Sequence, residues 1–471
     1  MKQIFHAMEY TSQDTFIPSE YIFEGDELMG WDITRNGENY LKLSKGYRLL
    51  KTKACGVCST DIDRRFLPFP LPQIIGHELI AEDPSTKKLY AVEINDTLQA
   101  RGSEQLDSFC NTGLSTHSPS RMVLGIDRLP GGFGPYILAP KNAMVEILGI
   151  DANTAVLTEP FSAALQAVIS SPPQENSTVA VLGPRRLGSL IIGALSIYRK
   201  SSGINFKIVS LARHDHLLKL SINLGADEAI DLRKNSLDLN KKYDIVYDTT
   251  ANPLGFEDAL KYSKKEVHLK STNGQTVCGI KKMTELVVDE ISILPFNEPN
   301  LNFCWEGENR QNEIIYVSPS LIDKIKLDEK FKVFSTSDVI ELYGILQSDI
   351  FKDRLPRFDL AIVSNTQEID FVLRPDPNSE ESLLRPRGAI LLKGEDSTNP
   401  FLNFIFTGGN LRSSRCGDFH LALDMLDKNP GLAKNLSKNM ISHEFMSDNL
   451  EAAFLKAKES DSIKVIVKFD E

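Results

Sequence analysis

Three short segments carry side chains that could together hold a catalytic metal ion. Residues 55–61 read Cys-Gly-Val-Cys-Ser-Thr-Asp, residues 76–78 read Gly-His-Glu, and residues 158–160 read Thr-Glu-Pro. They supply a thiolate, an imidazole and a carboxylate, and three such ligands leave one tetrahedral position for water or substrate, as catalytic zinc requires. From chemistry alone the signal is weak. A single His is usually structural, Glu-Pro is common at helix starts, and no second cysteine pair is available to close a zinc site.

A second chemical feature is a glycine turn at residues 183–188. The run 179–183 predicts a buried strand and the run 187–198 has helical spacing, which is the context of a dinucleotide-binding turn. Gly183, Leu187 and Gly188 fit that role. Arg185 stands where a glycine normally lets the backbone approach the pyrophosphate closely. Its long side chain opposes tight binding, although its charge could instead reach a phosphate.

Arg213 bears on the choice of nucleotide. It follows the predicted strand 206–212, at the place where an acidic residue is expected to hold a ribose hydroxyl. The missing acid and the presence of Arg213 favour a 2′-phosphate, and therefore NADP over NAD. The alternative is a solvated arginine on a loop.

The elements that position these residues change in type along the chain. The first 150 residues carry short β-rich runs broken by turn signals such as Pro130–Gly132, which predicts an irregular, mostly β domain. From about residue 178, strands alternate with helices, which predicts a doubly wound parallel sheet. The predicted strands there are 179–183, 206–212, 243–248 and 463–469, and the predicted helices are 187–198, 216–224 and 450–458.

A faint internal repeat indicates a second α/β unit. Phe206–Ser210 recurs as Phe331–Ser335, Tyr243–Val246 as Phe358–Ala361, and Val267–Lys270 as Ile390–Lys393. Three matches in the same order predict that residues 310–410 are a second, degraded copy; the alternative is that two α/β stretches share such strings by chance. At the place of the glycine turn the copy reads Ser318-Pro319-Ser320, so we expect no nucleotide there.

Composition excludes several classes of function. The chain has 53 Lys+Arg against 64 Asp+Glu, a net charge of −11, which argues against a nucleic-acid partner. The N-terminus lacks the pattern of a secretory signal, and the longest apolar stretch, 187–198, is shorter than the ~20 residues of a membrane helix. Six dispersed cysteines fit reduced thiols. We therefore expect a cytoplasmic protein with no membrane span.

Taken together, these segments resemble the zinc-containing medium-chain alcohol dehydrogenase family, especially its threonine- and sorbitol-dehydrogenase-like branches. The resemblance begins with the segment Lys53–Glu78. It continues, in the family's order, at residues 121–126, 132–133, 157–160, 181–188, 270–272, 288–291 and 414–419. It covers roughly residues 40–295 and 410–471.

The zinc ligands that this resemblance implies are Cys58, His77 and Glu159. It also implies that the Thr60 hydroxyl relays the alcohol proton, that Asp61 orients a ligand, and that Glu78 lies behind the metal. In this interpretation zinc lowers the pKa of the bound alcohol, and the alkoxide passes hydride to nicotinamide.

The family's second, structural zinc uses four closely spaced cysteines in a lobe that corresponds to residues 104–118. Here Cys110 alone remains, with Asp107 and Ser118 at the spacing of other ligands. One thiolate cannot close a tetrahedral site, so we expect one catalytic zinc and no structural zinc. Cys55 is better explained as a small buried core residue.

The predicted fold is α/β: a GroES-like, mostly β catalytic domain, a doubly wound Rossmann domain and a second, degenerate Rossmann-like unit. The predicted boundaries are 1–160, completed by 411–471, for the catalytic domain, 161–296 for the Rossmann domain, and 297–410 for the inserted copy. The predicted function is zinc-dependent hydride transfer between a small alcohol or polyol and NADP or NAD. The alternative is a family member that has lost catalysis and acts as a binding or scaffold protein, which the insertion and Arg185 favour. The inserted copy could cover a surface that homo-oligomers of the family bury, which would favour a monomer.

Overall fold

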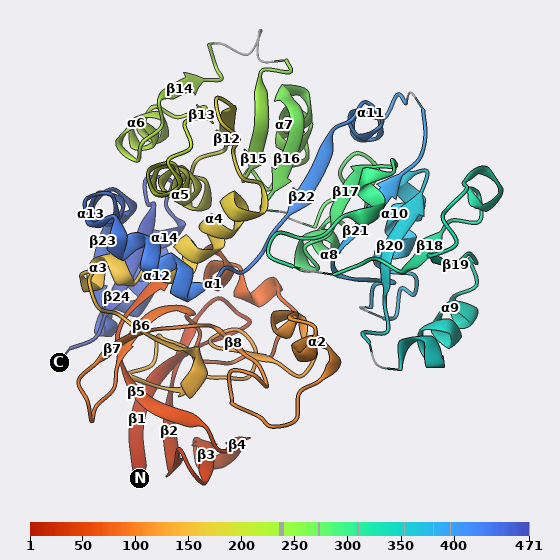
Figure 1. Cartoon of the computed structure of the whole chain (residues 1–471). Coiled ribbons are helices and arrows are strands. Elements are labelled where there is room, and N and C mark those ends of the chain that lie inside the picture. The colour runs from red at the N-terminus through yellow and green to blue at the C-terminus, as the bar shows by residue number, and fades with distance from the viewer. Residues whose placement is uncertain are drawn as a thin grey trace. The chain divides into compact units, whose positions relative to one another are not determined.

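The computed structural model describes residues 1–234, 240–271, 274–308, 310–352, 354–379, 381–395 and 397–470. It divides into two compact units, which are Met1–Ser162 with Gly417–Glu471, and Ala163–Cys416 (Figure 1). Thr272, in one of the segments that resemble the alcohol dehydrogenases, lies outside the described residues. Among the described residues, no helix has both the length and the apolar character needed to cross a membrane.

The first unit is built mainly of antiparallel strands. Its strands are β1 (Lys2–Tyr10), β2 (Phe16–Asp26), β3 (Gly30–Arg35), β4 (Glu38–Leu43), β5 (Tyr47–Val57), β6 (Glu78–Glu82), β7 (Leu89–Val92), β8 (Asn95–Asp96), β9 (Met122–Val123), β10 (Tyr136–Pro140), β11 (Met144–Glu146), β23 (Ile441–Met446) and β24 (Lys464–Lys468). Its helices are α1 (Ser59–Ile62), α2 (Ser108–Asn111), α3 (Ala152–Ala155), α12 (Phe419–Lys428), α13 (Pro430–Met440), α14 (Leu450–Lys458) and the start of α4 (Thr158–Ser170).

The C-terminal strand completes the main sheet of this unit. The strand order is β11-β7-β6-β5-β24-β23, with β10 also paired to β5, and a separate sheet has the order β1-β2-β3-β4. Strand β24 runs antiparallel to β5, with Val465 opposite Val57. Alternating apolar residues of β1, β2 and β5 and one face of α14 form the core, including Phe23, Leu50 and Phe454. The predicted mostly β character of the first 150 residues is confirmed.

The second unit contains one long sheet of eleven strands. Its strands are β12 (Thr178–Leu182), β13 (Lys207–Ala212), β14 (Glu228–Asp231), β15 (Tyr243–Asp248), β16 (Ser263–Leu269), β17 (Ser292–Pro295), β18 (Ile314–Val317), β19 (Lys332–Phe334), β20 (Phe358–Val363), β21 (Leu384–Leu392) and β22 (Asn410–Ser413). Its helices are α5 (Arg186–Ser202), α6 (Asp215–Asn223), α7 (Pro253–Tyr262), α8 (Met283–Val288), α9 (Val339–Leu346), α10 (Thr366–Leu373), α11 (Pro400–Phe406) and the rest of α4.

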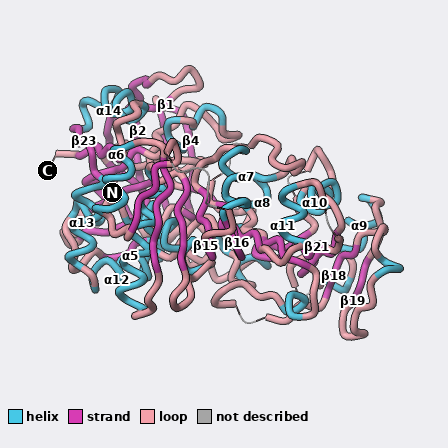
Figure 2. The backbone as a smooth tube through the Cα atoms, turned by 90° about the horizontal axis from the view of Figure 1, so that it is seen from above, coloured by secondary structure: helices cyan, strands magenta, loops and turns pink. Residues whose placement is uncertain are grey.

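Two groups of parallel strands make up most of this sheet, whose order is β14-β13-β12-β15-β16-β22-β17-β21-β20-β18-β19. We call β12 to β16 the first block and β18 to β21 the second block. Within the first block the order β13-β12-β15-β16 is repeated in the second block as β19-β18-β20-β21. Figure 2 shows β15, β16, β21, β18 and β19 following one another along one row. The three sequence matches of the internal repeat fall on β13 and β19, β15 and β20, and β16 and β21.

The predicted alternation of strands and helices from residue 178 is confirmed, because buried apolar runs formed strands and runs with helical spacing formed helices. The two blocks differ after their first strand. Strand β12 leads into α5, whereas β18 is followed by a single 3-10 turn, Ile322–Lys324. The second block therefore lacks a long helix at the place where the first block begins one.

Candidate functional site

The first group of chemical side chains lies on the turn between β5 and α1. Cys58 is the residue before α1, and its N–H donates to Asp61 Oδ2 at 2.9 Å. This bond closes the turn and places Thr60 beside the thiol, with Thr60 Oγ1 3.7 Å from Cys58 Sγ. Asp61 is fully buried. One helical turn therefore carries the thiol, a hydroxyl and an orienting carboxylate.

Pairing of β5 with β6 brings His77 to the same place. Gly56 of β5 lies opposite Glu78, the first residue of β6. A Cβ atom on Gly56 would lie 2.4 Å from Glu78 Oε2, so this close pairing requires glycine. His77 is buried, and its Nδ1 lies 3.2 Å from Asp61 Oδ1. Burial acts to lower the pKa of His77, but the Asp61 carboxylate and Cys58 outweigh it and hold that pKa well above the usual value.

Cys58, His77 and Glu78 form a group that could hold a metal ion. One ligand atom from each lies within 4.8 Å of the others. Glu78, however, is already paired: both of its carboxylate oxygens accept from Lys464 Nζ, at 2.7 and 2.6 Å, and both side chains are buried. The sequence did not single out Lys464 as a site residue. A charged residue inside the apolar strand 463–467 is the signal that could have identified it.

Glu159 faces the same group of charges from the first turn of α4. Burial raises the pKa of Glu159 to about 7, and the charge of His77 acts in the opposite direction. Glu78 and Lys464 also act on its carboxyl group. Cys58, Thr60 and His77 thus lie together, whereas Glu159 interacts electrostatically with His77 and is not one of the three residues whose donor atoms lie within 4.8 Å of one another.

The lobe at residues 104–118 is held by hydrogen bonds. Asp107 caps α2 by accepting from the N–H of Cys110 at 2.8 Å. The same carboxylate accepts from the hydroxyls of Ser118 and Ser120. In the described part of the chain, the Cys58–His77–Glu78 group is the one cluster of three potential metal ligands. Asp107 and Ser118 therefore bond to each other at the spacing where the alcohol dehydrogenase lobe has cysteines.

The predicted nucleotide turn lies between β12 and α5 in the second unit. Gly183 has φ +79°, and a Cβ atom on it would lie 2.9 Å from the Thr250 methyl group. A Cβ atom on Gly188 would lie 2.6 Å from Thr249 Oγ1, which itself donates to the Gly183 carbonyl. Both positions therefore require glycine. The turn leads into α5, and the N-terminus of a helix of 17 residues is a suitable place for a pyrophosphate.

The other predicted nucleotide residues surround this turn. Arg185 is exposed and immediately precedes α5, and its N–H donates to the Gly183 carbonyl at 2.7 Å. Leu187 is half-buried in the first turn of the helix. Arg213 follows β13, has a side chain that is 68% exposed, and lies 3.9 Å from Asp258. Its guanidinium is therefore accessible to an anionic ligand.

Comparison with known proteins shows which proteins the chain resembles. No protein-family model matches the chain. It is 26% identical over 265 residues to L-galactonate-5-dehydrogenase of Escherichia coli, a match that covers 50% of this chain and 76% of the relative. It is 30% identical over 207 residues to an alcohol dehydrogenase of Geobacillus stearothermophilus, covering 40% of this chain and 57% of that relative. In these segments the chain is similar in sequence to alcohol and polyol dehydrogenases.

Solved structures of alcohol dehydrogenases share the fold of the chain. An alcohol dehydrogenase from Escherichia coli complexed with NADH gives a TM-score of 0.55 at 15% identity and covers 99% of both chains. A putative zinc-binding dehydrogenase from Sinorhizobium meliloti bound to NADP gives 0.54 at 14% identity and also covers 99% of both chains. A sorbitol dehydrogenase of Halalkalibacterium halodurans matches 54% of its own length at 26% identity. At these coverages the matched segments span about half to three quarters of the curated relatives.

Proposed function

We propose that this chain is a zinc-dependent oxidoreductase that transfers hydride between a small alcohol or polyol and NAD(P). The observation that carries the proposal is the arrangement of Cys58, Thr60, Asp61 and His77 around one potential metal position. Relatives named for alcohols, sorbitol and L-galactonate support this substrate class.

The proposed zinc ligands are Cys58, His77 and Glu159. Glu78 is the competing carboxylate, since it lies in the close donor group. Lys464 already supplies Glu78 with a buried counter-charge, whereas Glu159 receives no hydrogen bond on its carboxylate from the described residues. A desolvated carboxylate that forms no close ion pair with a described residue is the better partner for a dication. In this arrangement Glu78 and Lys464 lie behind the metal.

The donor set fits zinc because it offers one thiolate, one imidazole and one carboxylate and leaves a fourth position open. When bound, zinc would polarise the substrate oxygen and nicotinamide would exchange hydride with the adjacent carbon. The chain's own residues orient the metal ligands and move the proton. Asp61 holds His77 through Nδ1, which leaves the other ring nitrogen for the metal. Thr60 Oγ1 lies beside the thiol and would relay the alcohol proton, accepting it while passing its own hydroxyl proton on to water.

The proposed nucleotide residues are Gly183, Arg185, Leu187, Gly188 and Arg213. The two glycines let the backbone approach the pyrophosphate, and the exposed Arg185 contributes charge at the same turn. The exposed guanidinium of Arg213 favours NADP, because a 2′-phosphate can form a charge-assisted hydrogen bond with it. We also propose a cytoplasmic location, consistent with six dispersed cysteines that form no disulfide among the described residues.

Residues 297–410 form, in this proposal, the inserted degenerate copy of the Rossmann domain 161–296. Asp244 in β15 accepts from the N–H of Thr178 at 2.9 Å, and Asp359 in β20 accepts from the N–H of Ile314 at 3.1 Å. The register also shifts at the same place in both, between the first and third residues of β15 and of β20. Independent α/β units have no reason to share both details.

In the second copy a carboxylate contacts the turn that corresponds to the glycine turn of the first. Ser320 Oγ donates to Glu368 Oε1 at 2.8 Å, and the N–H of Ser364 donates to Oε2 at 2.7 Å. This occupied turn, together with Pro319 and the missing helix, supports a structural copy that binds no nucleotide. We propose one nucleotide site per chain and a monomeric protein.

Metal analysis joined to an activity screen tests the proposed function. The purified chain should hold about one zinc equivalent and reduce NADP⁺ with a member of an alcohol and polyol panel. Cys58→Ser should lose both zinc and activity, whereas Cys278→Ser, which changes a thiol of the second unit, should keep both. Glu159→Gln should weaken zinc binding more than Glu78→Gln does. Zinc retention by Cys58→Ser, or two zinc equivalents, would contradict the proposed site, and failure to bind either nucleotide would favour a non-catalytic binding protein.

A further inference from the structure

The two blocks of the long sheet are joined in an unusual order. In the chain, β16 is followed by α8 and β17, yet the neighbour of β16 in the sheet is β22. Likewise β21 is followed by α11 and β22, yet the neighbour of β21 is β17. Both closing pairs are parallel, and β17 meets β22 antiparallel at Ile293 and Leu411. Each block is therefore closed by the strand that follows the other block.

We infer that the two blocks exchange their closing strands, so that the second block is an obligatory folding partner of the first block. In this arrangement the edge of β16 is completed by the return of the chain from the second block. The second block in turn is completed by the strand that leaves the first. Removing either closing strand would expose unpaired backbone N–H and C=O groups along a buried edge.

Polar side chains select β22 as the neighbour of β16. His268 in β16 is fully buried and its Nε2 lies 2.9 Å from the hydroxyl of Ser414, which follows β22. Lys270 Nζ donates to the carbonyls of Ser414 and Arg415 at 2.9 and 2.8 Å. A buried polar group without its partner is destabilising, so this network disfavours any other strand beside β16.

A second polar contact holds β17 beside β21. Glu290, just before β17, accepts from Arg387 Nε of β21 at 2.8 Å. The backbone N–H of Arg387 donates to the carbonyl of Asp289 at 2.7 Å. Glu290 also accepts from the N–H of Arg415 at 2.7 Å, so one buried carboxylate joins β21, the start of β17 and the end of β22.

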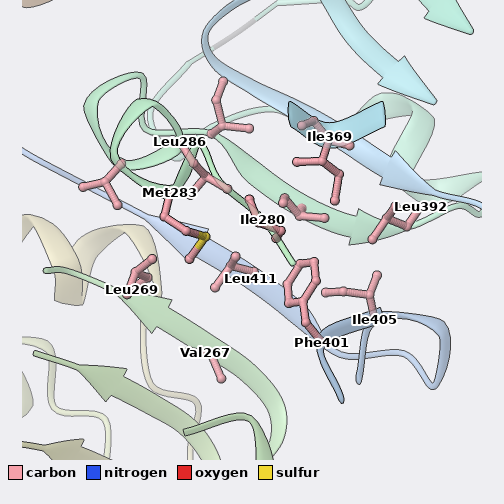
Figure 3. Close-up of a cluster of buried hydrophobic side chains, with 14 of the residues drawn as sticks. Val267, Leu269, Ile280, Met283, Leu286, Ile369, Leu392, Phe401, Ile405 and Leu411 are labelled. Carbon is pink, nitrogen blue, oxygen red and sulfur yellow. The ribbon is translucent and has the colours of Figure 1, made fainter. Parts of the chain in front are cut away.

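A single apolar core runs through the junction. Figure 3 shows Val267 and Leu269 of β16 and Leu411 of β22 packed in one cluster with residues of the second block. Ile369 and Leu392 come from the second block, and Met283, Leu286, Phe401 and Ile405 come from α8 and α11, which lead into the exchanged strands. Because apolar side chains from both blocks bury one another, unfolding of either block would expose the core of the other. The blocks should therefore unfold as one cooperative unit.

Hydrogen exchange in the full-length protein tests this coupling without any nucleotide, so its outcome is independent of the proposed function. Leu360→Ala removes buried side-chain atoms from β20 in the second block. A loss of this kind should accelerate the slowest-exchanging amides on the order of 30-fold or more. We expect the same factor in β12 and β13 of the first block as in β18 and β20. Ile208→Ala in β13 should show the reciprocal effect, and Ile340→Ala, at a side chain that is 84% exposed, should change neither block.

Acceleration confined to the mutated block would overturn the inference. If Leu360→Ala does not fold, Ile362→Val provides a milder change, with an expected common factor of about 2- to 13-fold. Disulfide mapping tests the exchange itself. Glu266 is opposite Asn410 in the parallel pair β16–β22, so Glu266→Cys with Asn410→Cys should cross-link within one chain. Glu266→Cys with Ser292→Cys should not; a cross-link there would place β17 beside β16 and refute the exchange.

Discussion

Asp61 provides a direct test of how the metal ligands are oriented. Its Oδ2 accepts from the N–H of Cys58 at 2.9 Å, and its Oδ1 lies 3.2 Å from His77 Nδ1. In Asp61→Asn the amide oxygen must stay on the Cys58 N–H, because that donor is part of the backbone. The amide NH₂ then faces His77 Nδ1 and turns this nitrogen into an acceptor. The proton of the neutral ring moves to Nε2, the nitrogen that we propose as the zinc ligand.

The expected loss of zinc affinity follows from this change of the His77 tautomer. Mutation of a residue that orients a ligand typically lowers metal affinity 10- to 100-fold, which corresponds to ~1.4–2.7 kcal/mol. Competition with a fluorescent zinc chelator measures the affinity directly, without relying on catalysis. Asp63→Asn is the matched control, since it removes the same charge two residues away on an exposed side chain. Unchanged zinc affinity in Asp61→Asn, or an equal loss in Asp63→Asn, would refute the reasoning.

Three further predictions concern the second unit. NADPH should bind more tightly than NADH, by about 10- to 150-fold for a charge-assisted bond of ~1.5–3 kcal/mol. Arg213→Ala should remove most of this difference in affinity. Equal affinities in the parent protein would contradict the preference. Calorimetry should detect one nucleotide site per chain. Gly188→Val should abolish this site, because the valine side chain would collide with Thr249 and the Gly183 carbonyl. A nucleotide site that survives the substitution would assign binding to the second block. Burial raises the pKa of Asp248 to about 6, while the Asp of an unfolded chain titrates near ~4. The folded state therefore binds the proton more tightly, and the free energy of unfolding should fall by up to ~3 kcal/mol as pH rises from about 4 to about 6. Asp248→Asn should flatten this profile in denaturant titrations at pH 5 and pH 8, and an unchanged profile would exclude Asp248 as its source.

Local patterns in the sequence were sufficient to predict several elements, whereas the ligand set of the candidate site came from the resemblance to the alcohol dehydrogenases. Cys58, Thr60 and Asp61 lie on one turn, so their spacing alone brings them together. The strands at β12, β13 and β15 and the helices α5 and α14 were predicted within a few residues, because burial alternates with the period of each element. The glycine turn could also be recognised in the sequence, because a positive φ and close backbone contacts allow few residue types other than glycine.

Only the tertiary structure decided which distant residues meet. Lys464 neutralises Glu78 although the two residues are 386 positions apart, and no local sequence pattern predicts that they form a pair. The same holds for the sheet. Strand β22 reads Asn-Leu-Arg-Ser and has no apolar run that would predict a buried strand. The apolar residues of β17 carry no information about its neighbours, because any buried strand offers the same backbone hydrogen bonds. Partners are chosen by side chains far apart in the chain, such as His268 with Ser414 and Glu290 with Arg387. Strand pairing is a long-range choice, so the exchange between the two blocks became visible only in three dimensions.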